Sequence, residues 1–186
     1  MDFHMRHSFF YKIAILFCLL FATFSALAWD HGISLGYGGG SDINHHNDTN
    51  SGAFLSAEFM PIKQKDWMNL TFNGSLGNWY STAATNKDLF TAALSLALRL
   101  YPCHSAKMHP FFLASVGPAY LSNTHFGQNT QANNFAFQTV AGVGVEVGKA
   151  KRIDLNMRLV HFSNAYLMHP NQGFNIFYVV SVGYLF

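Results

Sequence analysis

The feature that most constrains this chain is an alternation of apolar residues with small or polar ones, which recurs in segment after segment beyond residue 28. Such a period of two predicts β-strands, because successive side chains of a strand point to opposite faces. Half of the residues are apolar and 11% are charged, yet no stretch after residue 28 is long and apolar enough for a transmembrane helix. A membrane-spanning structure would therefore have to be built from strands.

Eight strands are expected, separated by polar breaks rich in Gly, Asn and Pro. They cover residues 31–38, 53–60, 67–79, 89–101, 111–121, 135–148, 153–163 and 174–186. A soluble barrel of the lipocalin kind would also alternate. However, the positions opposite the apolar rows are mostly Gly, Ser, Asn and Thr, where a water-exposed wall would carry more charge. The pattern favours an all-β fold, an eight-stranded antiparallel transmembrane barrel of the bacterial outer membrane.

The last strand carries a second indication of that location. Its alternate positions are aromatic or β-branched and end on a terminal Phe186. This ending is similar to the signal by which outer-membrane barrels are recognised for insertion.

The first 28 residues resemble a secretory signal peptide. Arg6 and Lys12 precede an apolar run over residues 13–24, and Ala26 and Ala28 form a small-residue cleavage pattern. The run is short for a membrane anchor, which needs about 20 residues. We expect residues 1–28 to be cleaved and residues 29–186 to form a single outer-membrane β-barrel domain.

The charge and the cysteine and histidine content limit the kinds of partner and bound group that are expected. Without Arg6, Lys12 and Asp2, nine basic and eight acidic residues remain, so a nucleic-acid partner is not expected. Cys18 is lost with the signal peptide, leaving Cys103 without a disulfide partner. The histidines do not fall at metal-ligand spacing, and His45-His46 is assigned to a solvated loop. No metal is expected, and the sequence leaves open whether the barrel forms a homodimer.

The stretch from residue 160 to residue 175 places a base and a hydroxyl on one face of a strand. His161 and Ser163 continue the apolar row of the strand at residues 153–163, so both should face lipid. At about 3.3 Å per residue and a tilt of about 40°, His161 lies roughly 20 Å above Ile153, near the outer edge of an apolar band about 25 Å tall. The ester bonds of outer-leaflet lipid lie at about that level.

The motifs H-F-S-N-A at residues 161–165 and P-N-x-G at residues 170–173 resemble the signature of the PagL-type lipid A 3-O-deacylases. The resemblance implies a serine esterase that removes the 3-position hydroxyacyl chain of lipid A, with lipopolysaccharide as substrate and no cofactor. By the same resemblance Ser163 is the nucleophile, His161 is its general base and Asn164 holds the oxyanion.

The sequence departs from the family at the third catalytic position. Counting from His161, the acidic residue expected at the start of the final strand is Asn175. With Val182 and Tyr184 facing lipid, Asn175 would point into the barrel unless a bulge near Gly173 shifts it by one residue. The alternative function is a non-catalytic small barrel for adhesion, lipid binding or membrane stability.

Overall fold

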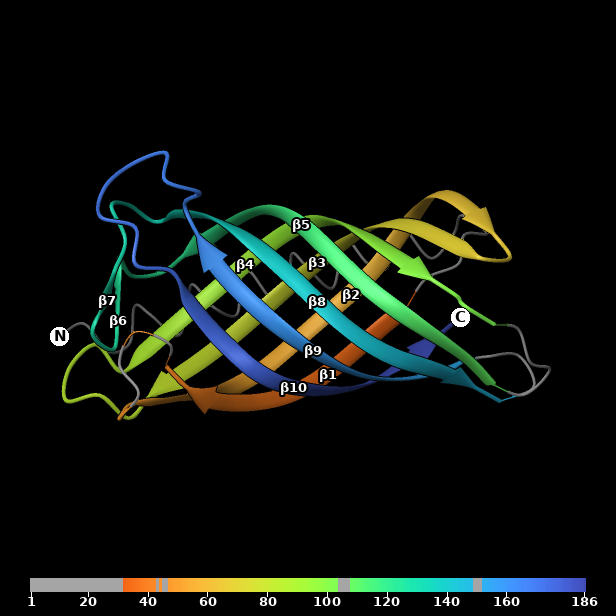
Figure 1. Ribbon diagram of the computed structural model, residues 1–186, viewed down its shortest axis with the longest axis horizontal. Helices are drawn as coiled ribbons and strands as arrows, with labels where there is room; N and C mark the ends of the chain where they lie inside the picture. Colours follow the sequence, from red (N-terminus) through yellow and green to blue (C-terminus); the bar gives the residue numbers. More distant parts are fainter. Residues whose placement is uncertain (1–31, 43, 45–46, 104–107, 149–151) are drawn as a thin grey trace, which may run out of the picture.

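The computed structural model describes residues 32–42, 44, 47–103, 108–148 and 152–186. The strands, shown in Figure 1, are β1 Gly32–Ser41, β2 Thr49–Lys65, β3 Met68–Ser81, β4 Asp88–Leu100, β5 Met108–Leu121, β6 His125–Phe126, β7 Asn129–Thr130, β8 Phe135–Val147, β9 Ile153–Ser163 and β10 Phe174–Leu185. The expected signal peptide lies outside the described residues.

In the described part of the chain, eight of these strands close into one antiparallel barrel in the order β1-β10-β9-β8-β5-β4-β3-β2. The predicted eight-stranded outer-membrane barrel is confirmed. Figure 1 places the β1–β2, β3–β4, β5–β8 and β9–β10 loops at one end, which we call the loop end, and the turn between β2 and β3 at the other. None of the described residues forms a helix of sufficient length and apolarity to cross a membrane.

The structure differs from the expected strand pattern in local details. Residues 61–65 lie in a break between two expected strands, but β2 continues through Lys65 with register shifts near Pro61. Proline usually marks a bulge or the edge of a sheet, yet β5 continues past Pro118 in unchanged register at the cost of one ladder bond. The loop at residues 122–134 contains the β6–β7 hairpin, a short unit that alternation over two residues cannot reveal.

The outer wall of the barrel is apolar. Exposed side chains on alternate positions of the strands form a continuous belt, which includes Leu35, Leu94, Val116, Leu155 and Val180. A lipocalin-type barrel would have this arrangement inverted. The wall is therefore suited to a hydrocarbon surround.

The barrel interior at the turn end holds a buried ion cluster. Arg99, which is 3% exposed, pairs with Glu58, with Glu146 at 2.8 Å and with Asp154 at 2.6 Å. The Tyr101 hydroxyl donates to Glu146 at 2.7 Å. The opposite charges of this cluster pair with one another inside the wall, as buried charges require.

The interior at the loop end contains a cluster of large apolar side chains in addition to the small or polar inward residues that were expected. Phe54, Trp79, Phe162, Phe174 and Ile176 are almost fully buried there. An eight-stranded barrel is narrow enough for side chains to fill it, so its inward positions can pack as an ordinary core.

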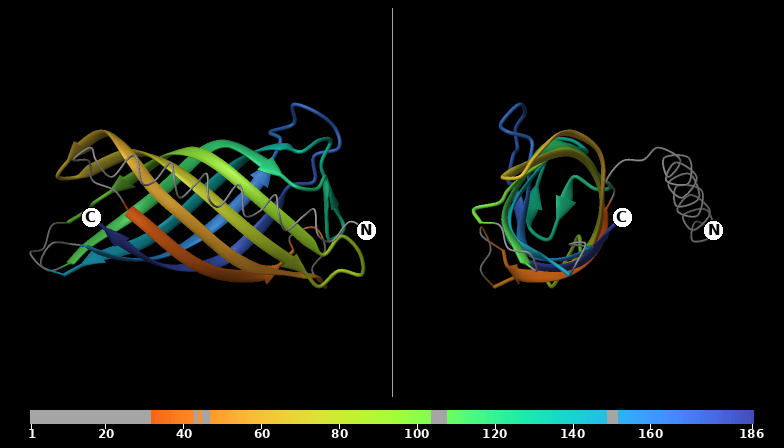
Figure 2. Two further views of the ribbon diagram at one scale, coloured as in Figure 1. Left: turned by 180° about the vertical axis from the view of Figure 1, so that it is seen from behind. Right: turned by 90° about the vertical axis from the view of Figure 1, so that its right-hand side faces the viewer.

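The β6–β7 hairpin closes this end of the barrel. Viewed along the barrel axis in Figure 2, it lies within the outline of the wall. The Phe126 ring contacts Phe174 at a centroid distance of 5.1 Å, and Asn129 donates to Asp42 at 2.5 Å. The hairpin thus joins the β1–β2 loop to the start of β10, where the candidate site begins.

Candidate active site

β9 carries the first two candidate residues in the predicted orientation. Ile153, Leu155 and Met157 are exposed on its outward row, and His161 and Ser163 continue that row as half-buried side chains. The intervening positions, including Asp154 and Arg158, are buried in the interior. The base and the hydroxyl therefore both lie on the lipid side of the wall, about 6.6 Å apart along the strand.

A β-bulge brings Asn175 to the same face. The register between β9 and β10 shifts between Ile176, which pairs with Val160, and Val179, which pairs with Arg158. One extra residue is accommodated there, and Tyr178 has a φ of 57°. The inward position expected for Asn175 depended on the absence of a bulge near Gly173; the structure has a bulge, and it lies at residues 176–179. It reverses the parity of the preceding residues, so Asn175 pairs directly with His161 on the outer face.

Asn175 is hydrogen-bonded to the imidazole. His161 Nδ1 and Asn175 Oδ1 are 2.8 Å apart, so the Nδ1–H donates to the amide oxygen. This bond fixes the tautomer in which Nε2 is the free basic nitrogen. Within the described residues, neither Nε2 nor Ser163 Oγ has a hydrogen-bond partner, so the bond between them is not formed in this arrangement. Such bonds are often long before substrate binds.

Gly173 packs its backbone closely against His161 and Ser163. A Cβ at that position would lie 2.8 Å from His161 Cε1, 2.9 Å from the Phe162 carbonyl oxygen and 3.2 Å from Ser163 Cβ. No side chain fits without moving the imidazole. The Gly173 carbonyl accepts a hydrogen bond from Asn44 Nδ2 at 3.2 Å, which ties the segment to the β1–β2 loop.

Asn164 lies at the base of the β9–β10 loop and is 1% exposed. Its backbone N–H donates to Asn171 Oδ1 at 2.9 Å, and its side-chain amide donates to the carbonyls of Met168 at 2.9 Å and Pro170 at 3.4 Å. All of its N–H groups thus hold the loop together. An oxyanion could accept a hydrogen bond from one of these N–H groups only if that group gave up its present acceptor.

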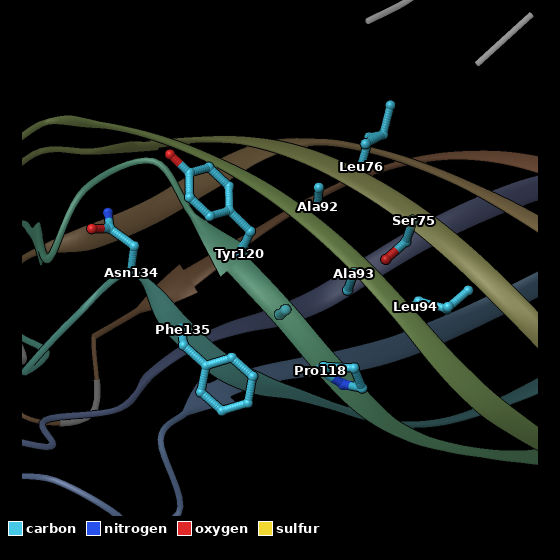
Figure 3. Close-up of a pocket in the computed structure, with 10 residues that line it drawn as sticks. Ser75, Leu76, Ala92, Ala93, Leu94, Pro118, Tyr120, Asn134 and Phe135 are labelled. Carbon is cyan, nitrogen blue, oxygen red and sulfur yellow. The ribbon is translucent and has the colours of Figure 1, made fainter. Parts of the chain in front are cut away.

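An open groove of about 600 Å³ lies on the wall near the site (Figure 3). It is lined by Ser75, Leu76, Ala92, Ala93, Leu94, Pro118, Ala119, Tyr120, Asn134 and Phe135. The Phe135 ring contacts Phe137 at a centroid distance of 5.1 Å, and Phe137 pairs with Ser163 across β8 and β9. The groove is therefore an apolar surface that adjoins the site through these two rings.

Of the four residues singled out from the sequence, the structure brings His161 and Asn175 into contact and places Ser163 on the same outward row, whereas Asn164 is bonded within the β9–β10 loop. It adds Asn171 and Gly173, whose contacts with Asn164 and His161 the sequence did not predict. The P-N-x-G motif was the signal that could have indicated them. Among the described residues, no three His, Cys, Asp or Glu side chains are grouped so as to hold a metal ion; His45 and His46 lie outside these residues.

Comparisons with known proteins indicate the family of this chain. The chain is 27% identical over 86 residues to the lipid A deacylase PagL of Pseudomonas aeruginosa, a match that covers 45% of this chain and about half, 49%, of that relative. It resembles the crystal structure of the outer membrane enzyme PagL with a TM-score of 0.60 and 20% identity, covering 83% of this chain and 97% of that one. The family model described as "Lipid A 3-O-deacylase (PagL)" matches residues 51–184. This match spans most of the barrel, and the chain therefore belongs to the PagL family.

Proposed function

We propose that this protein is a lipid A 3-O-deacylase that hydrolyses the 3-position hydroxyacyl ester of lipid A by a serine mechanism. The observation that carries the proposal is the hydrogen bond of 2.8 Å between His161 and Asn175, next to Ser163 on the lipid-facing row. An oriented imidazole beside a hydroxyl is the arrangement that activates a serine nucleophile. We infer lipid A as the substrate from the membership of the chain in the PagL family.

In the first step Ser163 Oγ attacks the ester carbonyl carbon while His161 Nε2 takes the hydroxyl proton. The tetrahedral intermediate then collapses, the bond from the carbonyl carbon to the sugar oxygen breaks, and His161 returns the proton to that oxygen. The products are an acyl-serine and a lipid A with a free 3-hydroxyl group. Asn175 keeps the imidazole in the tautomer that this transfer needs.

In the second step His161 removes a proton from water, and the resulting hydroxide attacks the acyl-serine. The hydroxy fatty acid leaves, and Ser163 recovers its proton from His161. We assign stabilisation of both oxyanions to Asn164. Because its N–H groups are bonded to Asn171, Met168 and Pro170, this role requires the substrate oxygen to displace one of these acceptors.

The direction of the site supports a lipid substrate. His161 and Ser163 open toward the hydrocarbon side of the wall, where a water-soluble ester would be scarce. The apolar groove beside Phe135 offers a surface for an acyl chain of the bound lipid. Filling it with Ala92→Phe should raise KM for lipopolysaccharide, whereas Leu155→Phe on the exposed belt should not.

Mass spectrometry of lipid A tests the proposal. Expression in a host with intact lipid A should yield a species lighter by one hydroxyacyl group. Ser163→Ala should abolish that species, and Ser51→Ala on β2 should leave it unchanged. An unmodified lipid A with folded wild-type barrel in the outer membrane would refute the proposal. It would favour the non-catalytic alternative, a small barrel for adhesion, lipid binding or membrane stability.

A further inference from the structure

The loop between β9 and β10 differs from the other loops at its end of the barrel. Among the described residues of these loops, it is the one with large apolar side chains on its surface: Tyr166, Leu167 and Met168 are 73%, 64% and 49% exposed. Residues 164–173 contain no Asp, Glu, Lys or Arg. An exposed apolar patch on an otherwise polar end is typical of a surface that meets a partner.

The direction of the loop identifies that partner. In Figure 1 the loop turns away from the barrel axis, and in the end-on view of Figure 2 it extends beyond the outline of the wall. It leaves the wall at Asn164, one residue after Ser163. Since Ser163 lies near the outer edge of the apolar band, a loop that runs sideways from this height extends over the outer leaflet.

The loop is held in this shape by specific contacts. Asn164 donates to the Met168 carbonyl, and the Leu167 N–H donates to the Asn164 carbonyl at 3.1 Å. Asn133 Nδ2 lies 3.2 Å from Met168 Sδ. Ala165 and Tyr166 have φ values of 53° and 60°, a left-handed conformation that costs non-glycine residues about 1–3 kcal/mol each. A strained turn fixed by a buried amide presents its apolar side chains outward instead of folding them onto the barrel.

We propose that residues 165–168 form a membrane-docking loop whose partner is the outer-leaflet lipid next to Ser163. Leu167 enters the acyl-chain region, and Tyr166 lies in the headgroup layer, where its ring is buried and its hydroxyl stays wet. The loop is continuous with the lipid-facing belt of β9 and enlarges it beside the nucleophile. Docking rests on the position of the barrel in the membrane, and its role in presenting substrate rests on the proposed function.

Spin labelling tests the docking directly. In a Cys103→Ser background, single cysteines are placed at Leu167, at Leu155 in the lipid-facing belt and at Ala84 in the exposed β3–β4 loop. The labelled barrels are reconstituted in phosphatidylethanolamine and phosphatidylglycerol vesicles. We expect the oxygen-to-nickel accessibility ratio at Leu167 to approach that at Leu155. A ratio equal to that at Ala84 would overturn the proposal, and a label at Tyr166, placed in the headgroup layer, should give a ratio between those at Leu167 and Ala84.

A kinetic experiment tests the role in substrate presentation. Tyr166→Ser combined with Leu167→Ser should reduce turnover of lipopolysaccharide in bilayers about tenfold more than turnover of a short-chain soluble ester. The matched control is Ala84→Ser. An equal loss on both substrates would overturn the presenting role. A wild-type protein that hydrolyses neither substrate would refute the proposed function and leave the spin-label result standing.

Discussion

Asn175→Asp should accelerate the enzyme. The two side chains have the same shape, so the aspartate can accept the His161 Nδ1–H at the distance of 2.8 Å that Asn175 now uses. The new carboxylate would stabilise the imidazolium that forms when Ser163 loses its proton, which an amide cannot do by charge. The chemical step should become faster without any new contact.

The gain can be bounded from the geometry. Loss of a triad aspartate to asparagine costs about 10⁴-fold where the wrong tautomer results. Here Asn175 already holds the correct tautomer, so the charge effect is what remains. Two unit charges about 4 Å apart interact by about 1–4 kcal/mol between water and a partly buried site, which corresponds to about 5-fold to 1,000-fold in kcat.

Steady-state hydrolysis of lipopolysaccharide in detergent micelles would measure this gain, with Asn175→Ala as the partner variant. We expect Asp to exceed Asn and Asn to exceed Ala in kcat. Equal rates for wild type and Asn175→Ala would remove Asn175 from the mechanism. A folded Asn175→Asp protein no faster than wild type would show that imidazolium stabilisation does not limit the rate.

Three further variants test other contacts. Gly173→Ala should lower kcat at least about 100-fold, because its Cβ would meet His161 Cε1 at 2.8 Å; unchanged activity would show that the imidazole can move freely. Asn171→Ala removes the acceptor of the Asn164 N–H and should lower activity and shorten the lifetime of the β9–β10 loop against protease, and a loop as resistant as wild type would argue against that anchor. Arg99→Ala leaves the buried carboxylates of Glu146 and Asp154 and the half-buried Glu58 without the guanidinium that pairs with all three, and it should reduce the free energy of unfolding in urea by about 3–5 kcal/mol; an unchanged midpoint would refute the structural role of the cluster.

Most of the wall was predictable from the sequence because period 2 is a local property. The outward positions of Ile153, Leu155 and Met157 follow from alternation alone, and so do those of His161 and Ser163. The same alternation could not tell what fills the interior. Phe54 and Trp79 occupy inward positions at the loop end, where packing against Phe126 and other residues far along the chain replaces water.

The surroundings of the site depended on contacts between distant segments. Asn44 donates to the Gly173 carbonyl across 129 positions, and Asn129 joins Asp42 across 87. Neither contact has a periodic signal. The family motif identified which residues matter at the site, but which atoms they contact came from the way the loops fold over the barrel mouth.

The position of Asn175 shows how packing of the core and assembly of the site depend on one register. In a regular β10 with Val180 and Val182 outward, Ile176 would face lipid and Asn175 would point into the apolar interior beside Phe162. An amide buried there without a partner would cost about 1–3 kcal/mol. The bulge at residues 176–179 reverses both positions: Ile176 is fully buried, and Asn175 reaches His161. The energetic cost of the left-handed conformation at Tyr178 is thus offset by the burial of Ile176. The same register shift completes the candidate site.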